Sequence, residues 1–600
     1  MRELVTKGLS SLKKKGVRHT VERAANSIVV GVNRRADRAD NQRYAEWIGR
    51  FDTLTETHRQ NLASHLNQFK YRPLISVLMP VYNTPEIWLR RAIESVQKQL
   101  YPEWELCIAD DASNEIQVRE ILEEYAASDS RLKVHYRSRN GHISAASNSA
   151  LGLAGGEFVA LLDHDDELHE LALYCVAAEL NANPDADLLY TDEDTIDTDG
   201  VRASPHFKSD WNPDLLLSQN YINHMTAYRT SIVRETGGFR EGLEGSQDYD
   251  LLLRVSERIT PSRIRHIPRV LYHWRSIPGS VAQDESQKDY SIPAAVLALT
   301  AHLERTQREG IAKSLGHHRY RIHYRLPGSL PRVSIVVFSA GAVADVEKIR
   351  TNTSYSNYDI IVLSRQVNAL SLNEAAKSSE AEILLFLDGA CSPDDADWLQ
   401  EMVSHTMRPE IGVTGAKLLD SAGRIVHAGM ILGVRDDRLT KVAESAFHEL
   451  KPTDRRAVRL GRSQLVQNFS AVSRSCLMMR RKLFEELEGF DEINTPDAFY
   501  DIDLCLRLVE AGYRVVVTPF AIMRFRASKS TRSTNKAKEN GVLRTEYDYM
   551  HARWGSRLGN DPYYNPNLDL ARPWYELAFP PRVNNLLTMH QKNRDVNQNL

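Results

Sequence analysis

The chain has 600 residues, of which 42% are hydrophobic and 26% charged, and its formal net charge is −3 at pH 7. This length exceeds what one hydrophobic core organises, so we expect at least two domains, and the near-neutral charge gives no basis for bulk nucleic-acid binding. The five cysteines are scattered and lack C-x-x-C spacing, which predicts a protein without disulfides or a zinc site. The sequence shows no signal peptide and no apolar run near the roughly 18 residues of a membrane span, so we expect a cytoplasmic protein.

Residues 1–72 form a basic arm that we expect to be helical. Its lysines and arginines are interleaved with apolar residues such as Leu9 and Leu12, a pattern typical of an amphipathic helix. A basic amphipathic helix can lie on an anionic membrane surface. It can equally be a solvated helix that packs on the domain or on a partner. The sequence leaves both interpretations open, including peripheral contact with the inner face of the plasma membrane.

The first domain is expected over residues 73–310 and begins with a βαβ unit. Residues 74–83 form an apolar strand that ends in proline and asparagine, an amphipathic helix follows, and a second apolar strand ends in Asp110 and Asp111. A carboxylate at this point can accept hydrogen bonds from a nucleobase N–H, or it can cap the next helix. The small residues of the loop at 140–148 allow backbone N–H groups to approach a diphosphate.

Residues 158–167 combine an apolar run of strand length with three carboxylates, Asp163, Asp165 and Asp166. Such a run is typical of a buried strand in a mainly parallel sheet, and ligands bind at the carboxyl ends of such strands. Crowded carboxylates repel one another unless a cation neutralises them, and hard oxygen ligands suit Mg²⁺ or Mn²⁺. For an isolated D-x-D pattern, a solvated acidic turn is the alternative interpretation.

Two further residues stand at the boundaries of downstream elements. Asp248 opens a helix, where an aspartate is most often a cap. His273 follows an apolar strand, where a histidine is usually structural, although neutral imidazole is also a common metal ligand.

In their order along the chain, these segments resemble the family 2 glycosyltransferases, whose nucleotide-binding fold is called GT-A. The matching segments cover roughly residues 73–285 and are Pro80-Val81-Tyr82-Asn83, Asp110-Asp111-Ala112-Ser113, Leu162-Asp163-His164-Asp165-Asp166, Gln247-Asp248-Tyr249-Asp250 and His273-Trp274-Arg275. The resemblance implies an α/β, Rossmann-like fold with a mostly parallel sheet. It also implies a metal-dependent, inverting transfer of a sugar from a nucleotide-sugar donor to an acceptor hydroxyl.

The resemblance implies roles for individual residues as well. Asp248 corresponds to the catalytic base, and Asp165 and His273 to the ligands of a Mn²⁺ or Mg²⁺ ion. The residues expected to bind the nucleotide are Pro80, Tyr82, Asn83, Asp111, Asn148 and Asp163. The acid that usually precedes the base is here Gln247, so a charge that could tune the base is missing.

The second half of the chain repeats the first, which predicts a second GT-A-like domain over residues 331–585 and a flexible tail over 586–600. Asp388 and Asp501 match Asp163 and Asp248 and mark a candidate second site. Three other counterparts differ: Ala390 replaces Asp165, Arg524 replaces His273 and Arg365 replaces Asp111. A working second site would need a cation such as Arg524 in place of the metal. We therefore favour a degenerate copy that supports the first domain or holds acceptor glycan.

These observations predict an inverting transferase that extends a bacterial surface glycan of the O-antigen or polysaccharide type on a glycan or lipid-linked acceptor. The bacterial and polysaccharide parts of this prediction are implied by the resemblance. The alternatives are a bifunctional transferase with both domains active and a non-catalytic glycan-binding scaffold of a polysaccharide assembly complex.

Overall fold

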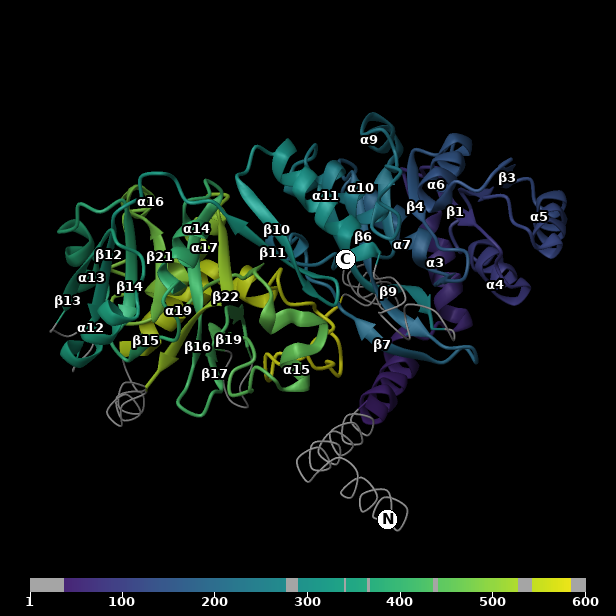
Figure 1. Ribbon diagram of the computed structural model, residues 1–600. Helices are drawn as coiled ribbons and strands as arrows, with labels where there is room; N and C mark the ends of the chain where they lie inside the picture. The colour runs from purple at the N-terminus through teal and green to yellow at the C-terminus, as the bar shows by residue number, and fades with distance from the viewer. Residues whose placement is uncertain are drawn as a thin grey trace, which may run out of the picture.

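The computed structural model describes residues 37–276, 290–338, 342–363, 367–434, 441–526 and 542–583. Residues 1–36 of the predicted basic arm and the whole predicted tail lie outside the described residues. Figure 1 shows two α/β halves side by side, the first coloured purple to teal and the second green. In the part of the chain that is described, no helix is long and apolar enough to cross a membrane.

The first half is built on a nine-stranded sheet in the order β3-β2-β1-β4-β8-β6-β9-β5, with β7 paired to β6. Its strands are β1 (Ile75–Val81), β2 (Trp104–Asp110), β3 (Leu132–Tyr136), β4 (Phe158–Leu161), β5 (Glu167–Leu168), β6 (Leu188–Ile196), β7 (Arg202–His206), β8 (Thr226–Arg229) and β9 (Ile264–Arg275). The pairs among β3, β2, β1 and β4 are parallel, whereas β8 is antiparallel to both of its neighbours. β1 and β2 are buried at every residue because helices cover both faces of the sheet.

The helices of the first half are α3 (Glu56–Leu66), α4 (Glu86–Gln97), α5 (Ile116–Ser128), α6 (His142–Leu153), α7 (Ala172–Ala182), α8 (Pro213–Leu216), α9 (Thr230–Glu235), α10 (Gln247–Ser256) and α11 (Ser291–Arg305). A further helix covers residues 37–47 and continues into η1 (Ile48–Asp52), and a 3₁₀ turn, η2, spans Pro261–Arg263. α4 buries Leu89, Ile93 and Val96 on one face, as its helical spacing predicts.

The second half contains another nine-stranded sheet, in the order β13-β12-β14-β21-β16-β22-β15, with β17 and β20 paired at its sides. Its strands are β12 (Val333–Phe338), β13 (Tyr358–Leu363), β14 (Ile383–Asp388), β15 (Cys391–Pro393), β16 (Ile411–Leu419), β17 (Ile425–His427), β20 (Gln467–Asn468), β21 (Cys476–Arg480) and β22 (Arg514–Phe525). A separate pair joins β18 (Met430–Leu432) to β19 (Ala443–Ser445). This order matches that of the first sheet with the edge strand β3 left out.

The helices of the second half are α12 (Ala342–Thr351), α13 (Ala369–Lys377), α14 (Trp398–Thr406), α15 (Arg455–Val458), η4 (Arg459–Gln464), α16 (Arg481–Glu486), α17 (Tyr500–Glu510) and α19 (Val542–Gly559). The first half inserts α5 and β3 between β2 and α6, whereas in the second half α13 follows β13 directly. The deletion of this unit explains why the sequence repeat is shorter in its early part. The predicted fold class, two tandem GT-A-like α/β sheets with a helical N-terminal region, is confirmed.

A buried polar interface joins the two halves around α8. Asp214 lies 2.6 Å from the guanidinium of Arg408, and the backbone N–H of Asn468 donates to the side chain of Asn212 at 2.9 Å. The hydroxyl of Ser218 donates to a carbonyl of the second half at 3.0 Å. Because each of these groups is buried and paired, the second half supports the first through specific contacts rather than through a flexible linker.

The hairpin of β10 (Gly310–Gly316) and β11 (Arg319–Tyr324) lies between the two halves (Figure 1). The Tyr320 N–H donates to the carbonyl of Ser218 in the first half at 2.8 Å. The guanidinium of Arg319 donates to the side chain of Gln464 in the second half at 2.6 Å. The hairpin therefore contacts both halves and closes one side of the space between them.

Candidate active site

A cavity of about 890 Å³ lies at the carboxyl ends of β1 and β4 and is bordered by the amino ends of α10 and α11. Ligands bind at this edge of open α/β sheets, and the volume is within the range of small-molecule sites. The structure brings five of the predicted site residues to its wall: Pro80, Tyr82, Asp111, Asp163 and Asp248. The second half and the hairpin also contribute to the wall, through Leu460, His317 and His318.

The acidic turn after β4 is held in place by β9. The hydroxyl of Tyr272 donates to Asp166 at 2.5 Å, and the backbone N–H of Arg275 donates to the same carboxylate at 2.7 Å. The Arg275 side chain also donates to the carbonyl of Asp165 at 2.7 Å and stacks over Trp88 at 4.4 Å. These contacts fix the backbone of the turn and leave the side chain of Asp163 42% exposed, facing the cavity.

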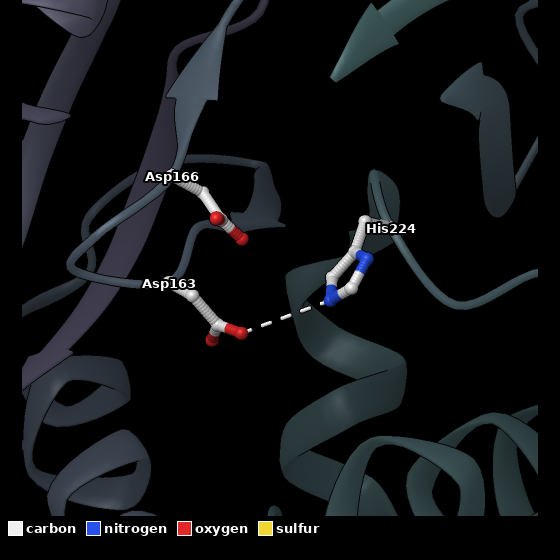
Figure 2. A group of neighbouring side chains, drawn as sticks. All are labelled: Asp163, Asp166 and His224. Atoms are coloured by element: carbon white, nitrogen blue, oxygen red, sulfur yellow. Dashed lines mark ion pairs between the residues drawn. The ribbon is translucent and has the colours of Figure 1, made fainter. Parts of the chain in front are cut away.

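His224, in the segment before β8, lies opposite the acidic turn (Figure 2). Its Nε2 is 3.7 Å from a carboxylate oxygen of Asp163, and its ring stacks on Tyr272 with the centroids 4.6 Å apart. Its Nδ1 is 3.5 Å from the carboxylate of Glu193, which in turn forms an ion pair with the buried Lys208 at 3.0 Å. The imidazole is therefore placed between two carboxylates.

Asp163, Asp166 and His224 each offer one ligand atom within 4.8 Å of the others. Burial raises the pKa of Asp166 well above its ordinary value, and the charges of Asp165 and Asp163 add to this rise. Burial alone would lower the pKa of His224, but hydrogen bonding to Asp163 and Glu193 raises it to about 10. Neighbouring carboxylates thus act on both groups, in addition to burial. Two carboxylates and one imidazole are a donor set that fits Mn²⁺ or Mg²⁺.

Asp248 reaches the cavity from the first turn of α10. The side-chain amide of Asn220 donates to its Oδ2 at 2.9 Å. Burial raises the pKa of Asp248, and the charge of Asp163 acts in the same direction, whereas His224 lowers it. A carboxylate with a raised pKa is a stronger base than an exposed aspartate, so Asp248 can accept a proton from a hydroxyl group in the cavity.

Asp111 is 2% exposed and forms one wall of the cavity with the loop that precedes α6. It accepts the backbone N–H of Gly141 at 3.0 Å and lies 2.7 Å from the guanidinium of Arg137. The carboxylate therefore holds the small-residue loop in position, in addition to any contact with a ligand.

Two polar residues predicted to bind the nucleotide do not line this cavity. Asn83 accepts the backbone N–H of Asn114 at 2.8 Å and so ties the loop after β1 to the loop after β2. Asn148 forms a reciprocal pair with the backbone of Phe239, in which it donates at 2.7 Å and accepts at 2.8 Å. Both side chains satisfy backbone groups of neighbouring loops, which is a structural role.

The structure also separates the two residues expected to ligate the metal from the Asp163–Asp166–His224 cluster. His273 is buried on the other face of β9, where its Nδ1 is 2.6 Å from Asp194. Successive side chains of a strand point to opposite faces, so Trp274 lines the cavity, Tyr272 lines a smaller adjoining cavity, and His273 lines neither. Asp165 does not line the cavity, and its nearest charged partner is the ring of His164 at 4.0 Å. Of the ionisable residues predicted at this site in the first half, Asp111, Asp163 and Asp248 line the cavity, whereas Asp165 and His273 do not.

The second half has no equivalent ligand group among the described residues. Arg365, the expected counterpart of Asp111, lies outside them. Arg524, proposed above to replace the metal, pairs instead with Asp394 at 2.8 Å. The nearer cation is Arg474: its backbone N–H donates to Asp501 at 2.8 Å, and the charges of Asp501 and Asp388 help to raise the pKa of its guanidinium against the effect of burial.

His224 is the functional residue that the sequence does not reveal. It lies in a polar loop, outside any helix or strand pattern, and comes into the site only because β8 inserts next to β4. Glu193 has a weak indication in the sequence, since it ends an apolar strand together with other acids. The antiparallel position of β8 is a property of the tertiary fold and has no local sequence marker.

Comparison with known proteins gives one family model, "Glycosyl transferase family 2", which matches residues 76–237. The chain is 31% identical over 233 residues to the putative glycosyltransferase EpsE of Bacillus subtilis. The alignment includes 82% of that protein and 38% of this chain. It is 33% identical over 586 residues to the O-antigen biosynthesis protein RfbC of Myxococcus xanthus, and 41% identical over 561 residues to the uncharacterized protein y4gI of Sinorhizobium fredii. These two alignments include 92% and 87% of this chain, but the chain spans only 44% and 61% of the length of those relatives.

Proposed function

Because the chain belongs to glycosyltransferase family 2, we propose that its first half transfers a sugar from a nucleoside-diphosphate sugar to a hydroxyl group of a surface glycan, with inversion at the anomeric carbon. The observation that carries this proposal is the meeting of two kinds of group at one cavity. The Asp163–Asp166–His224 cluster comes from the turn after β4 and the loop before β8, and Asp248 comes from α10.

Each group has a separate task in the proposed reaction. Asp248 accepts the proton of the acceptor hydroxyl while its oxygen forms a bond to the anomeric carbon and the bond to the diphosphate breaks. Asp163, Asp166 and His224 would hold a Mn²⁺ or Mg²⁺ ion, which when bound stabilises the negative charge of the departing diphosphate as a Lewis acid. Asp111 and the loop at Gly141 form the part of the wall next to the nucleotide, where backbone N–H groups and the start of α6 suit an anionic ligand.

The name of the Myxococcus relative supports a surface polysaccharide of the O-antigen type as the product. The aligned region is less than half of that relative, so the acceptor, which would be a glycan or a lipid-linked glycan, is part of the proposal. The cytoplasmic location and membrane contact of the basic arm stay predictions.

Two alternatives make different demands on the second half. A bifunctional transferase needs Asp501 to act as a second base, with Arg474 in place of a metal. A non-catalytic scaffold needs neither base. We favour a single active site because the described part of the second half lacks a counterpart of the Asp163–Asp166–His224 group.

The test is a screen of nucleotide sugars with the full chain in the presence of Mn²⁺ or Mg²⁺. The quantity measured is the release of the nucleoside diphosphate. We expect at least one donor to be turned over by the native protein and the Asp248→Asn variant to be slower by about 10²- to 10⁴-fold, the usual contribution of a general base. The variant should still bind the donor, since Asp248 lies outside the metal cluster. Equal turnover by Asp248→Asn would contradict the proposal.

A further inference from the structure

A second cavity, of about 120 Å³, lies where four parts of the chain meet. Its wall combines the helix at 37–47, the end of β7, the loop that follows α15 and the C-terminal segment at 568–577. Five arginines line it: Arg43, Arg455, Arg456, Arg459 and Arg462. Only two acids share the wall, Asp40 and Glu576. We call this space the arginine cavity.

Two of the arginines are neutralised by acids of the protein. Arg455 forms ion pairs with Asp37 and Asp40. Arg456 pairs with Asp454 at 3.0 Å and lies 3.6 Å from Glu576, which is also the nearest acid to Arg43, at 4.0 Å. The acids around the cavity are therefore already engaged.

Arg459 and Arg462 have only neutral hydrogen-bond partners within the described ranges. Arg459 donates to the carbonyl of Pro205 at 3.1 Å, and Arg462 donates to the carbonyl of Phe207 and lies over the ring of Tyr575 at 4.7 Å. Among the described residues, neither guanidinium has a carboxylate within 4.0 Å. Arg462 is only 7% exposed. Buried charges are normally paired, so the buried guanidinium of Arg462 beside the partly buried one of Arg459 at the same cavity indicates that an anion from outside completes the site.

The physical properties of the cavity limit the class of anion. Its volume is well below the roughly 300–1,000 Å³ of sites for whole small molecules, so it accommodates a single small group. Guanidinium groups bind oxyanions with two parallel hydrogen bonds, as in phosphate and carboxylate recognition. Burial lowers the pKa of Arg459, although the charges of Asp40 and Asp37 act in the opposite direction. The acids of the protein therefore do not fully compensate the positive charge of this guanidinium.

The arginine cavity adjoins the candidate active site. Leu460, with φ of 55°, lines both cavities and lies directly after Arg459. On the other side, His206 lines the active-site cavity while its neighbours Pro205 and Phe207 line the arginine cavity. A ligand between these two arginines therefore contacts the same short segments that form the active-site wall.

We propose that the arginine cavity is an oxyanion site that binds a phosphate or carboxylate group between Arg459 and Arg462. This inference does not depend on the proposed transfer reaction, since it uses none of the residues of the candidate active site other than the shared segments. The oxyanion is either a free ion or an anionic group of the molecule held in the neighbouring cavity.

Isothermal titration of the full chain with inorganic phosphate, after dialysis into a metal-free buffer without chelator, tests the site. We expect one binding event in the native protein, an affinity at least tenfold weaker in Arg459→Gln, and an unchanged affinity in Arg572→Gln. Arg572 is the matched control because it stacks on Trp574 at 4.7 Å but does not line the cavity. Arg43→Gln, at an exposed side chain, is a second variant that should also weaken binding if Arg459→Gln does not fold.

Absence of binding to the native protein, or equal affinity in Arg459→Gln and the native protein, would overturn the proposal. A glycan acceptor with and without a carboxylate then distinguishes the two sources of the oxyanion. If phosphate competes with the acceptor that carries a carboxylate but not with the neutral one, and this competition is lost in Arg459→Gln, the site binds the carboxylate of the acceptor. Phosphate binding without such competition assigns it to a free ion. Failure of the transfer reaction itself would leave the phosphate titration unaffected, so the two proposals fail separately.

Discussion

The two halves share their scaffold and differ in their chemistry. In the first half, Asn148 binds the backbone of Phe239 in both directions, and in the second half Asn373 binds Phe490 in the same way, at 2.9 and 3.0 Å. Arg254 joins Asp250 to the carbonyl of Gly238, and Arg507 joins Asp503 to the carbonyl of Gly489. These repeated bonds hold a loop and a helix to the sheet, and the duplication has kept them.

The difference lies at the position of the metal cluster. Phe158 and Ile383 pair with Arg229 and Arg480 respectively, so these arginines occupy equivalent places in the two sheets. The residue five positions before each is His224 in the first half and Ser475 in the second. Next to Ser475 stands Arg474, whose charge acts on Asp388 and Asp501. The fold alone therefore does not make the site, because the second half keeps Asp388 and Asp501 but has no group of three metal-ligating side chains among its described residues.

The largest expected effect concerns the interface that lets the second half support the first. Replacing Arg408 by Met leaves the buried carboxylate of Asp214 without its closest partner, at 2.6 Å. We expect the free energy of unfolding to fall by about 3–5 kcal/mol, the usual cost of breaking a buried ion pair, as measured by urea denaturation. Lys482→Met, which removes an exposed pair with Glu486, should change it by less than about 1 kcal/mol. Equal effects in the two variants would mean that the interface does not couple the halves.

The next effect distinguishes His224 from His273 in the first half. His224→Gln should weaken Mn²⁺ binding by more than about 100-fold, because even partners outside the ligand set contribute about 10- to 100-fold. His273→Gln should destabilise the fold by about 1–3 kcal/mol, since it disturbs a buried hydrogen bond to Asp194, but leave the Mn²⁺ affinity of the folded protein unchanged. The reverse pattern would restore His273 as the ligand and contradict the cluster described here.

The acid side of the pH profile of kcat/KM should report Asp248. Its pKa in the folded protein is raised above the ordinary value of 3.8, so the basic form is present above the raised pKa and is lost as the pH falls through it. Activity should therefore drop about tenfold per pH unit below a point higher than that of an exposed aspartate. Asn220→Ala removes a hydrogen bond that favours the charged form, and it should move this limb to higher pH by about one unit. A limb that stays in place would exclude Asp248 as the titrating group.

The smallest effect is expected in the second half. Asp501→Asn removes the counterpart of the proposed base, but Asp501 already accepts the N–H of Arg474. We expect transfer by the first half to stay within about twofold, because Asp501 lies outside the proposed site and the amide oxygen of asparagine can still accept the backbone N–H of Arg474. Loss of one of two distinct products in this variant would instead establish a bifunctional enzyme.

Much of the fold follows from the sequence because buried parallel strands are continuous apolar runs and because the second half repeats the first. The position of Asp111, Asp163 and Asp248 at one cavity also follows, since each ends a strand or begins a helix at the same edge of the sheet. The motif implies His273 as a site residue, whereas the alternation of side chains along β9 directs Trp274 to the cavity and Tyr272 to the smaller cavity beside it.

Polar residues in loops are the other group that sequence cannot assign. Asn83 and Asn148 have side chains that suit a nucleotide, but both are used by backbone groups of neighbouring loops. The partner of such a side chain depends on which loops the fold brings together. For the same reason the sequence does not indicate His224, which lies far from Asp163 along the chain. Only the pairing of β8 with β4 in the folded sheet brings the two residues together.

The most direct test of the comparison is the number of Mn²⁺ ions bound per chain, measured by titration in the presence of a nucleoside diphosphate. We expect one ion in the native protein, none in Asp163→Asn, and one in Asp388→Asn, because among the described residues only the first half has three ligand side chains close enough to share an ion. Two ions in the native protein, or one ion that survives in Asp163→Asn and is lost in Asp388→Asn, would contradict a single metal-dependent site in the first half.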